Sequence, residues 1–196
     1  MPDQRIYNVG WICATKPEYV AAQAFLDEKH DQPDHASTND NNIYTIGKFG
    51  KHHVVIGTLP DGEYGIAAAV GVAMGMLYSF PNVRIGFMVG IGGGAPSLKN
   101  DIRLGDIVVS APRNGHGGVF QYDFGKTIQD KKFQTNGFLN QPPELLRAAV
   151  ADIKAEYELE GHQLDAAIDA ALNQRPRLRK NYQRPSDDSD RLFRSD

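Results

Sequence analysis

The chain of 196 residues has the length of one domain and can bury a substantial core. Its 41% hydrophobic and 23% charged residues are ordinary for a soluble globular protein. The formal net charge of −3 gives no electrostatic basis for binding nucleic acid or an anionic membrane. The polar start is not a secretory signal, no apolar run approaches the ~20 residues of a membrane span, and the single Cys13 is typical of a reducing compartment. We therefore expect an intracellular, cytoplasmic protein.

The first part of the chain combines strand and helix patterns. Thr15 and Pro17 are typical of a helix start, because Thr caps helices and Pro is tolerated in the first turn. The patterns predict a strand at 5–13, a helix from 17 to about 30, a surface loop at 31–42, and a hairpin of strands at 43–49 and 52–59.

The middle of the chain is more apolar. Residues 66–80 are rich in alanine and apolar on nearly all sides, which predicts a buried helix. The continuous apolar run at 85–91 predicts a central parallel strand buried on both faces. Further elements are predicted as strands at 107–110 and 119–124 and helices at 142–157 and 164–172. Strands interleaved with helices predict an α/β fold.

The glycine-rich sequence that follows residue 89 is the first candidate for a ligand site. Without Cβ atoms, Gly90, Gly92, Gly93 and Gly94 would let a ligand lie against the backbone. With Ala95, the sequence formally matches a dinucleotide-binding pattern, but the residues after it indicate a turn into another strand instead of the required helix. A glycine-rich turn without a ligand is the alternative.

Glu18 is the second candidate, one turn into the first predicted helix and just beyond the first strand. Carboxyl ends of strands line the ligand crevice in open α/β sheets, so Glu18 can face a site. Alternatively, its carboxylate merely complements the helix N-terminus. Asp106 is expected to cap or form a turn before its strand. No cluster has metal-ligand spacing, and we expect no metal and no cofactor.

Several segments, taken together and in order, resemble the purine nucleoside phosphorylase and nucleosidase superfamily. They are residues 9–14 with Glu18, the helix start at 65–69, residues 89–94 and residues 104–110. The variant is similar to the nucleoside phosphorylase-like domain of fungal multidomain proteins, where it often precedes NACHT, ankyrin or tetratricopeptide modules. Residues 120–126 and 190–193 also resemble segments of that variant.

The resemblance implies a three-layer α/β/α fold around a mixed, partly barrel-like sheet at residues 1–174. A polar tail or the start of an insertion would follow at 175–196. It also implies cleavage of the N-glycosidic bond of purine nucleosides or nucleotides. The ribose would pass through an oxocarbenium-like state that needs nearby negative charge and an oriented nucleophile. On the family pattern Glu18 would activate water, and Gly90, Ile91, Gly92 and Gly93 would lie beside the ribose and base.

Two departures from the family pattern modify this expectation. Phosphorylases of the family place an arginine before the glycine stretch to hold phosphate, whereas Met88 lies there and Arg84 lies at the strand start. Hydrolysis is therefore favoured over phosphorolysis, and phosphate remains a second candidate ligand. The family's general acid and last strands lie beyond the final residue, so we expect a shortened domain that is weak or inactive alone.

A non-catalytic nucleotide-binding or interaction module is the alternative function. Because family members are usually oligomeric, the resemblance also allows a homo-oligomer.

Overall fold

The computed structural model describes residues 3–32, 40–98, 100–113, 116–121, 125–126, 134–135 and 140–191. The chain divides into two compact units. The first unit comprises Met1–Ala95 and Ala170–Gln183, and the second comprises Pro96–Asp169 and Arg184–Asp196.

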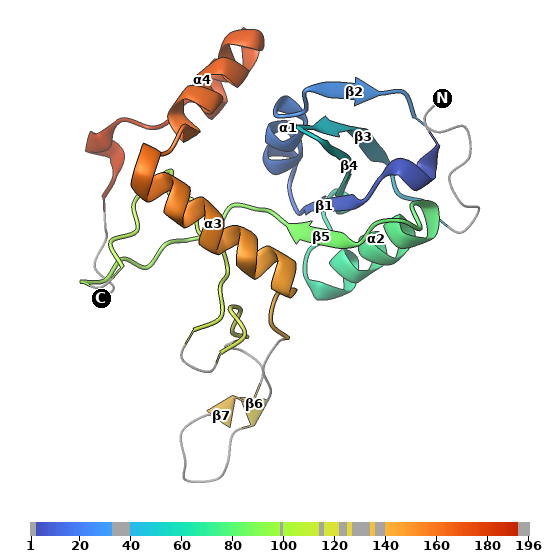
Figure 1. The fold of residues 1–196 in the computed structure, drawn as a ribbon, viewed down its shortest axis with the longest axis horizontal. Helices are drawn as coiled ribbons and strands as arrows, with labels where there is room; N and C mark the ends of the chain where they lie inside the picture. The colour runs from blue at the N-terminus through green and yellow to red at the C-terminus, as the bar shows by residue number, and fades with distance from the viewer. Residues whose placement is uncertain are drawn as a thin grey trace. The chain divides into compact units, whose positions relative to one another are not determined.

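A five-stranded sheet forms the centre of the first unit (Figure 1). Its strands are β1 (Val9–Cys13), β2 (Glu28–His30), β3 (Tyr44–Phe49), β4 (His52–Thr58) and β5 (Ile85–Met88), in the spatial order β2-β3-β4-β1-β5. β1 is parallel to β4 and β5, whereas β3 is antiparallel to β2 and β4. The mixed α/β class agrees with the prediction, but the described sheet is open, with no closure toward a barrel.

The hairpin of β3 and β4 is confirmed nearly to its predicted ends. Its turn contains Gly50 at φ +57°, a left-handed conformation that favours glycine. The backbone N–H of Gly50 also donates to Asp27 Oδ2 at 2.6 Å. This bond ties the turn to the chain just before β2.

Helix α1 (Lys16–Ala24) begins after Thr15 as predicted but ends earlier than expected. Residues Glu28–His30, which the prediction gave to the end of this helix, pair as β2 with β3 instead. The apolar spacing of the helix stops at Leu26, and the polar residues that follow gain backbone partners along the open edge of β3. The helix prediction was therefore wrong beyond residue 24.

Two core clusters involve different helices. Because successive side chains of a strand alternate in direction, β4 gives Val54 and Ile56 to one cluster and Val55 to the other. The cluster with α1 residues contains Val9, Cys13, Ala22, Leu26, Val54 and Ile56. The cluster with helix α2 (Ile66–Ser79) contains Tyr7, Tyr44, Ile46, Val55, Met76, Phe80 and Val83.

The predicted burial of β5 and α2 needs correction. β5 is parallel, as predicted, but lies at the edge of the sheet, so it is not a central strand buried on both faces. Phe87 is 40% and Met88 62% exposed. Helix α2 also has the predicted extent, yet one of its faces is exposed.

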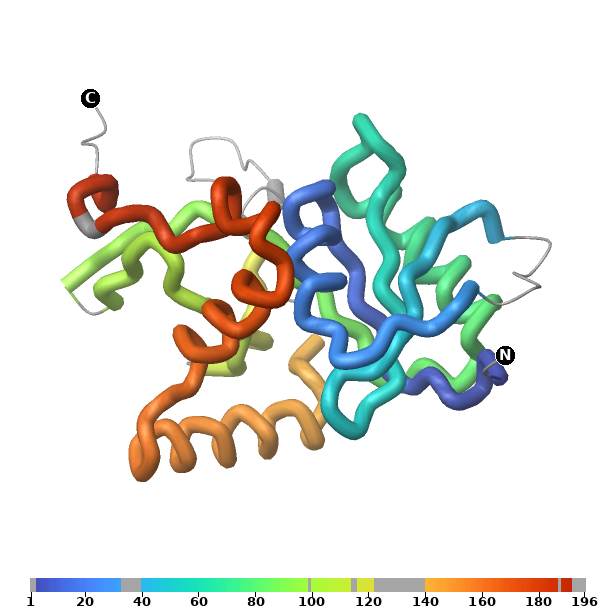
Figure 2. Tube along the Cα trace, turned by 90° about the horizontal axis from the view of Figure 1, so that it is seen from above, coloured from blue at the N-terminus to red at the C-terminus, as the bar shows by residue number. Residues whose placement is uncertain are grey.

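From residue 140 to residue 191 the described chain is mostly helical (Figure 2). The remaining elements are η1 (Gln4–Ile6), β6 (Gly125–Lys126), β7 (Gln134–Thr135), α3 (Glu144–Glu160), α4 (Leu164–Gln174), η2 (Pro176–Leu178), α5 (Arg179–Tyr182) and η3 (Asp187–Ser189). Helices α3 and α4 match the predicted pair. Among the described residues, no helix is both long and apolar enough to cross a membrane.

Neither predicted strand of the second unit is present among its described residues. Residues 107–110 form no strand, and Ile107, Val108 and Val109 are 64%, 71% and 62% exposed. Without a paired neighbour in this unit, their β-branched character alone does not create a strand. The described part of the predicted strand at 119–124 is also irregular, and residues 122–124 lie outside the described residues.

Candidate functional site

Glu18 and the start of the glycine-rich segment come together at one end of the sheet of the first unit. β1 and β5 are parallel neighbours, so their carboxyl ends, Cys13 and Met88, lie at the same edge. The chain leaving β1 turns into α1, which carries Glu18, and the chain leaving β5 continues into Gly90 and Ile91. The topology therefore places two segments 73 residues apart side by side.

The Glu18 carboxylate is held by three backbone N–H groups. The N–H of Ile91 donates to Oε1 at 2.8 Å, and the N–H groups of Ala14 and Thr15 donate to Oε2 at 2.7 and 2.8 Å. The bond from Thr15 satisfies an N–H at the start of α1, as the helix-terminus alternative predicted. The bond from Ile91 is not explained by helix capping, because its donor belongs to the glycine-rich segment.

The hydrogen bonds keep Glu18 ionised. Burial of the carboxylate raises its pKa, but the N–H groups of Ile91, Thr15 and Ala14 outweigh this effect, so the pKa of Glu18 lies below its ordinary value. The site therefore presents a fixed negative charge at neutral pH.

The absence of a side chain at Gly90 leaves room for this contact. A Cβ at position 90 would lie 3.0 Å from Glu18 Oε1, so the carboxylate would have to move by a few tenths of an ångström. Gly92 and Gly93, which the family resemblance groups with Gly90 and Ile91, are exposed, and a Cβ added to either would meet nothing within 4 Å. The structure thus brings together Glu18, Gly90 and Ile91, and leaves Gly92 and Gly93 without a contact of this kind.

No helix begins at residues 95–98 or 100–113, which directly follow the glycine-rich segment. Dinucleotide binding to a G-x-G-x-x-G pattern needs a helix N-terminus for the pyrophosphate. Asp106 takes the expected turn role, because the N–H of Arg103 donates to its Oδ2 at 2.9 Å.

Cys13, the last residue of β1, is fully buried. Burial and, secondarily, the negative charge of Glu18 raise the pKa of the Cys13 thiol to about 11. The thiol is therefore neutral at physiological pH and a poor nucleophile. It packs as a small residue in the core cluster that includes Ala22 of α1.

The carboxylate of Asp40 is buried, although the sequence predicts a surface loop at this position. Asp40 is 8% exposed. Its Oδ1 accepts from the backbone and side-chain amides of Asn42, at 3.0 and 2.7 Å, and its Oδ2 accepts from the hydroxyls of Tyr44, at 2.9 Å, and Ser79. Burial raises the pKa of Asp40, but these hydrogen bonds lower it to a value below its usual range. All of these groups are occupied with one another, so the cluster ties α2 to β3.

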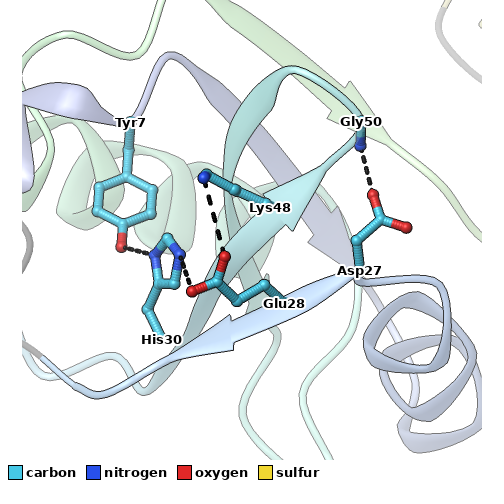
Figure 3. Close-up of polar contacts among 6 residues, drawn as sticks. All are labelled: Tyr7, Asp27, Glu28, His30, Lys48 and Gly50. Carbon is cyan, nitrogen blue, oxygen red and sulfur yellow. Dashed lines mark hydrogen bonds and ion pairs between the residues drawn. The ribbon is translucent and has the colours of Figure 1, made fainter.

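A second polar cluster surrounds β2 (Figure 3). The Tyr7 hydroxyl lies 2.6 Å from His30 Nδ1, and His30 Nε2 lies 3.7 Å from Glu28 Oε1. Glu28 Oε2 lies 3.8 Å from Lys48 Nζ on β3. Burial and the charge of Glu28 raise the pKa of Tyr7 to about 12, so its hydroxyl stays protonated. Because Tyr7 is completely buried, this cluster fastens the edge strand and offers no accessible nucleophile.

A groove of about 500 Å³ lies along α1 but does not include Glu18. It is lined by Val20, Gln23 and Ala24 of α1 and by residues 174–178. Within the described ranges, no group of three His, Cys, Asp or Glu side chains could hold a metal ion. Glu18 and the adjoining backbone of Gly90 and Ile91 are therefore the candidate site.

No protein-family model matches the chain, and no solved structure does. The chain is 46% identical over 166 residues to a "Nucleotide-binding leucine-rich repeat (NLR)-like protein" from Hyaloscypha variabilis. The similarity covers 85% of this chain and 16% of that protein, so the chain spans less than a fifth of the relative's length. The chain is thus similar in sequence to one part of an NLR-like protein.

Proposed function

We propose that this chain is a nucleoside phosphorylase-like domain of an NLR-type protein, which cleaves the N-glycosidic bond of a purine nucleoside or nucleotide by hydrolysis. The observation that supports this most is the hydrogen bond between the Ile91 N–H and Glu18 Oε1, which joins the two segments that the family resemblance assigned to the substrate. In the complete fold, the sheet would be the middle of three layers.

The chemistry of glycoside cleavage fits a permanently ionised carboxylate. Positive charge develops on the ribose as the bond to the base breaks, and a fixed negative charge nearby stabilises it. Glu18 Oε1 accepts one protein hydrogen bond, so a lone pair remains for a water molecule. That water would be held beside the ribose by the same carboxylate that stabilises the charge.

Hydrolysis is favoured over phosphorolysis because of the charges around the strand end. A bound phosphate beside Glu18 would face a carboxylate that stays ionised, and like charges at short range repel. Met88 ends β5, where a phosphate would need a cation. Arg84 lies before the other end of β5, and its Nη1 donates to the Pro81 carbonyl at 3.1 Å.

A non-catalytic nucleotide-binding module is the second candidate. The lowered pKa of Glu18 makes its carboxylate a weak proton acceptor, which disfavours general-base catalysis. The name of the relative also includes nucleotide binding, although that protein is much longer than this chain. Binding of a purine nucleotide without release of its base would distinguish this function.

The test is to incubate the purified chain with adenine and guanine nucleosides and nucleotides, with and without phosphate, and to quantify free base by chromatography. Because no residue of this chain is assigned the role of the general acid that protonates the departing base, we expect only weak base release. It should not depend on phosphate and should fall by about 100-fold or more in Glu18→Gln, because the fixed negative charge is lost. Glu63→Gln, which neutralises an exposed carboxylate in a loop of the same unit, is the matched control and should retain activity.

Three results would contradict parts of this proposal. Equal activity of Glu18→Gln and the unmodified chain would exclude the role given to Glu18. A strict requirement for phosphate would replace hydrolysis by phosphorolysis. Calorimetric binding of a nucleotide by the folded chain, with no free base formed, would support the binding module instead.

A further inference from the structure

The groove along α1 lies apart from the candidate site and is formed by two segments of the first unit. Val20, Gln23 and Ala24 of α1 form one wall, and residues 174–178 form the other. Its volume of about 500 Å³ lies within the range of pockets that hold small molecules. The three α1 residues span about 6 Å along the helix axis. A bound helix makes contacts over about two turns, so the groove suits a compact ligand better than a helix.

The described residues that line this groove carry only positive charge. Among them, Arg175 and Arg177 alone are ionisable. From residue 170 to residue 186 the sequence contains five cationic and no acidic side chains. A further cation contacts the opposite wall, because Lys29 Nζ donates to Gln23 Oε1 at 3.2 Å. The groove is therefore suited to an anion.

The two arginines of the groove have hydrogen-bond donors to spare. Arg175 donates from Nη1 to Gln174 Oε1 at 3.4 Å, and neither it nor Arg177 forms an ion pair with another described residue. Each guanidinium carries five N–H donors, so most of them remain available. By contrast, Arg184 of the second unit lies 3.8 Å from the carboxylate of Asp165.

The backbone holds the arginines in place before any ligand binds. The N–H of Arg175 donates to the Leu172 carbonyl at 3.3 Å, and the N–H of Leu178 donates to the Arg175 carbonyl at 2.9 Å. Leu172 is 6% exposed and anchors the end of α4. Pro176 has a fixed φ between the two arginines. Such pre-organisation lowers the entropy that is lost on binding.

We infer that this groove binds a small organic phosphate, namely a phosphate monoester with a flat apolar body. The phosphate carries a charge of about −1.5 to −2 at neutral pH, which two guanidinium groups balance, whereas an acidic side chain would bring a single charge. Each arginine can hold phosphate oxygens through two parallel hydrogen bonds. The body of the ligand lies against Val20, Ala24 and Leu178. Glu18 does not line the groove, so the inference does not depend on the proposed function.

The test is isothermal titration calorimetry of the unmodified chain with 1-naphthyl phosphate, which has the inferred chemistry and contains no purine. The comparison ligands are 1-naphthol, which lacks the phosphate, and inorganic phosphate, which lacks the apolar body. We expect 1-naphthyl phosphate to bind at least about 10-fold more tightly than either of them, because only it uses both parts of the groove. Its binding should weaken as the salt concentration rises.

Variants locate the binding in the groove. Arg175→Gln and Arg177→Gln should each weaken binding by about 10-fold or more, because charge-assisted hydrogen bonds are lost. Lys180→Gln is the matched control, since it removes the same charge from an exposed residue of the same segment that does not line the groove. Val20→Phe should fill the groove and reduce binding without a change in charge. Glu18→Gln should bind as the unmodified chain does.

Four results would overturn the inference. The first is no binding of 1-naphthyl phosphate by a chain that circular dichroism shows to be folded. The second is an equal loss in Arg177→Gln and Lys180→Gln, which would indicate unspecific attraction to the basic segment. The third is equally tight binding of inorganic phosphate, since the apolar wall would then contribute nothing. The fourth is full binding by Val20→Phe, which would place the ligand outside the groove.

Discussion

Glu18 combines two roles that its sequence position presents as alternatives. Its Oε2 accepts the N–H groups at the start of α1, as a helix-terminal carboxylate does, while Oε1 accepts the Ile91 N–H. A carboxylate that merely complemented its own helix would have no reason to face the chain after β5. The two oxygens thus link a local structural role with the candidate site.

The pKa of Glu18 leads to a prediction about stability. Because its pKa is lower in the folded than in the unfolded chain, the ionised group stabilises the fold above the unfolded pKa of about 4.3. This contribution is lost as the pH falls through the folded pKa. Glu18→Gln should therefore lower the free energy of unfolding by about 1 kcal/mol at pH 7, as loss of a helix cap does.

Urea denaturation of Glu18→Gln and the unmodified chain at a series of pH values checks this prediction. The difference between them should disappear once the pH is below both pKa values of Glu18. A difference that stays constant into strong acid would mean that the hydrogen bonds of the neutral side chain, and not its charge, stabilise α1.

Distance along the chain does not decide which residue contacts could be predicted. Glu18 and Ile91 are 73 residues apart, yet each follows a predicted strand, and the carboxyl ends of parallel strands lie at one edge of a sheet. The burial of Asp40 could not be predicted, because it depends on Ser79 of α2 and no local pattern indicated that this helix packs against the loop. Polar residues in a loop-like sequence predict exposure unless the fold supplies such partners.

At the scale of elements, α2 has two glycines with opposite structural requirements. A Cβ on Gly75 would lie 2.3 Å from Asn42 Nδ2 and 2.5 Å from Asp40 Oδ1. Gly75→Ala should therefore displace the Asp40 cluster and cost about 1–3 kcal/mol, as overpacking of a core does. The same substitution at Gly71 meets open space and should stabilise the helix by about 0.5–1 kcal/mol, since Ala favours the helix.

Chemical denaturation of the two alanine variants measures both effects on one helix. Equal free energies of unfolding for Gly75→Ala and Gly71→Ala would contradict the prediction. They would show that α2 can shift away from Asp40 without a cost.

The predictions of helices and strands were correct where a local sequence pattern determines the element. They were wrong where pairing with another strand determines whether a strand forms. The strands of the hairpin are apolar, close in sequence and joined by a tight turn, so their pattern was sufficient. β2 consists of the polar residues Glu28–His30 and exists because β3 offers an edge for pairing. The run at 107–110 has the composition of a strand, yet no partner strand of the second unit pairs with it.

At the scale of the whole molecule, the two units should differ in their protection from hydrogen exchange. Amides of β1, β3 and β4 are paired in the sheet and next to the core clusters, so they should exchange orders of magnitude more slowly than in an unfolded chain. Residues 104–109 are exposed and outside any strand, and apart from the Asp106 N–H, which donates to the Arg103 carbonyl, their amides should exchange almost freely.

Hydrogen exchange followed by mass spectrometry of peptic peptides tests this contrast. Strong protection of residues 107–109 would contradict it and would indicate that they form the strand predicted from the sequence. Peptides of β1 that exchange as fast as those of residues 104–109 would contradict the assignment of a stable sheet to the first unit.

The position of β1 in the sheet has a consequence for protein synthesis. β1 leaves the ribosome before both of its neighbours in the sheet, β4 and β5, which follow it in the sequence. The hairpin of β3 and β4 can close on its own soon after translation, whereas β1 has no partner until β4 is complete. During that interval the apolar residues of β1 are open to chaperones, so slower translation through residues 52–58 should prolong chaperone binding to the nascent chain.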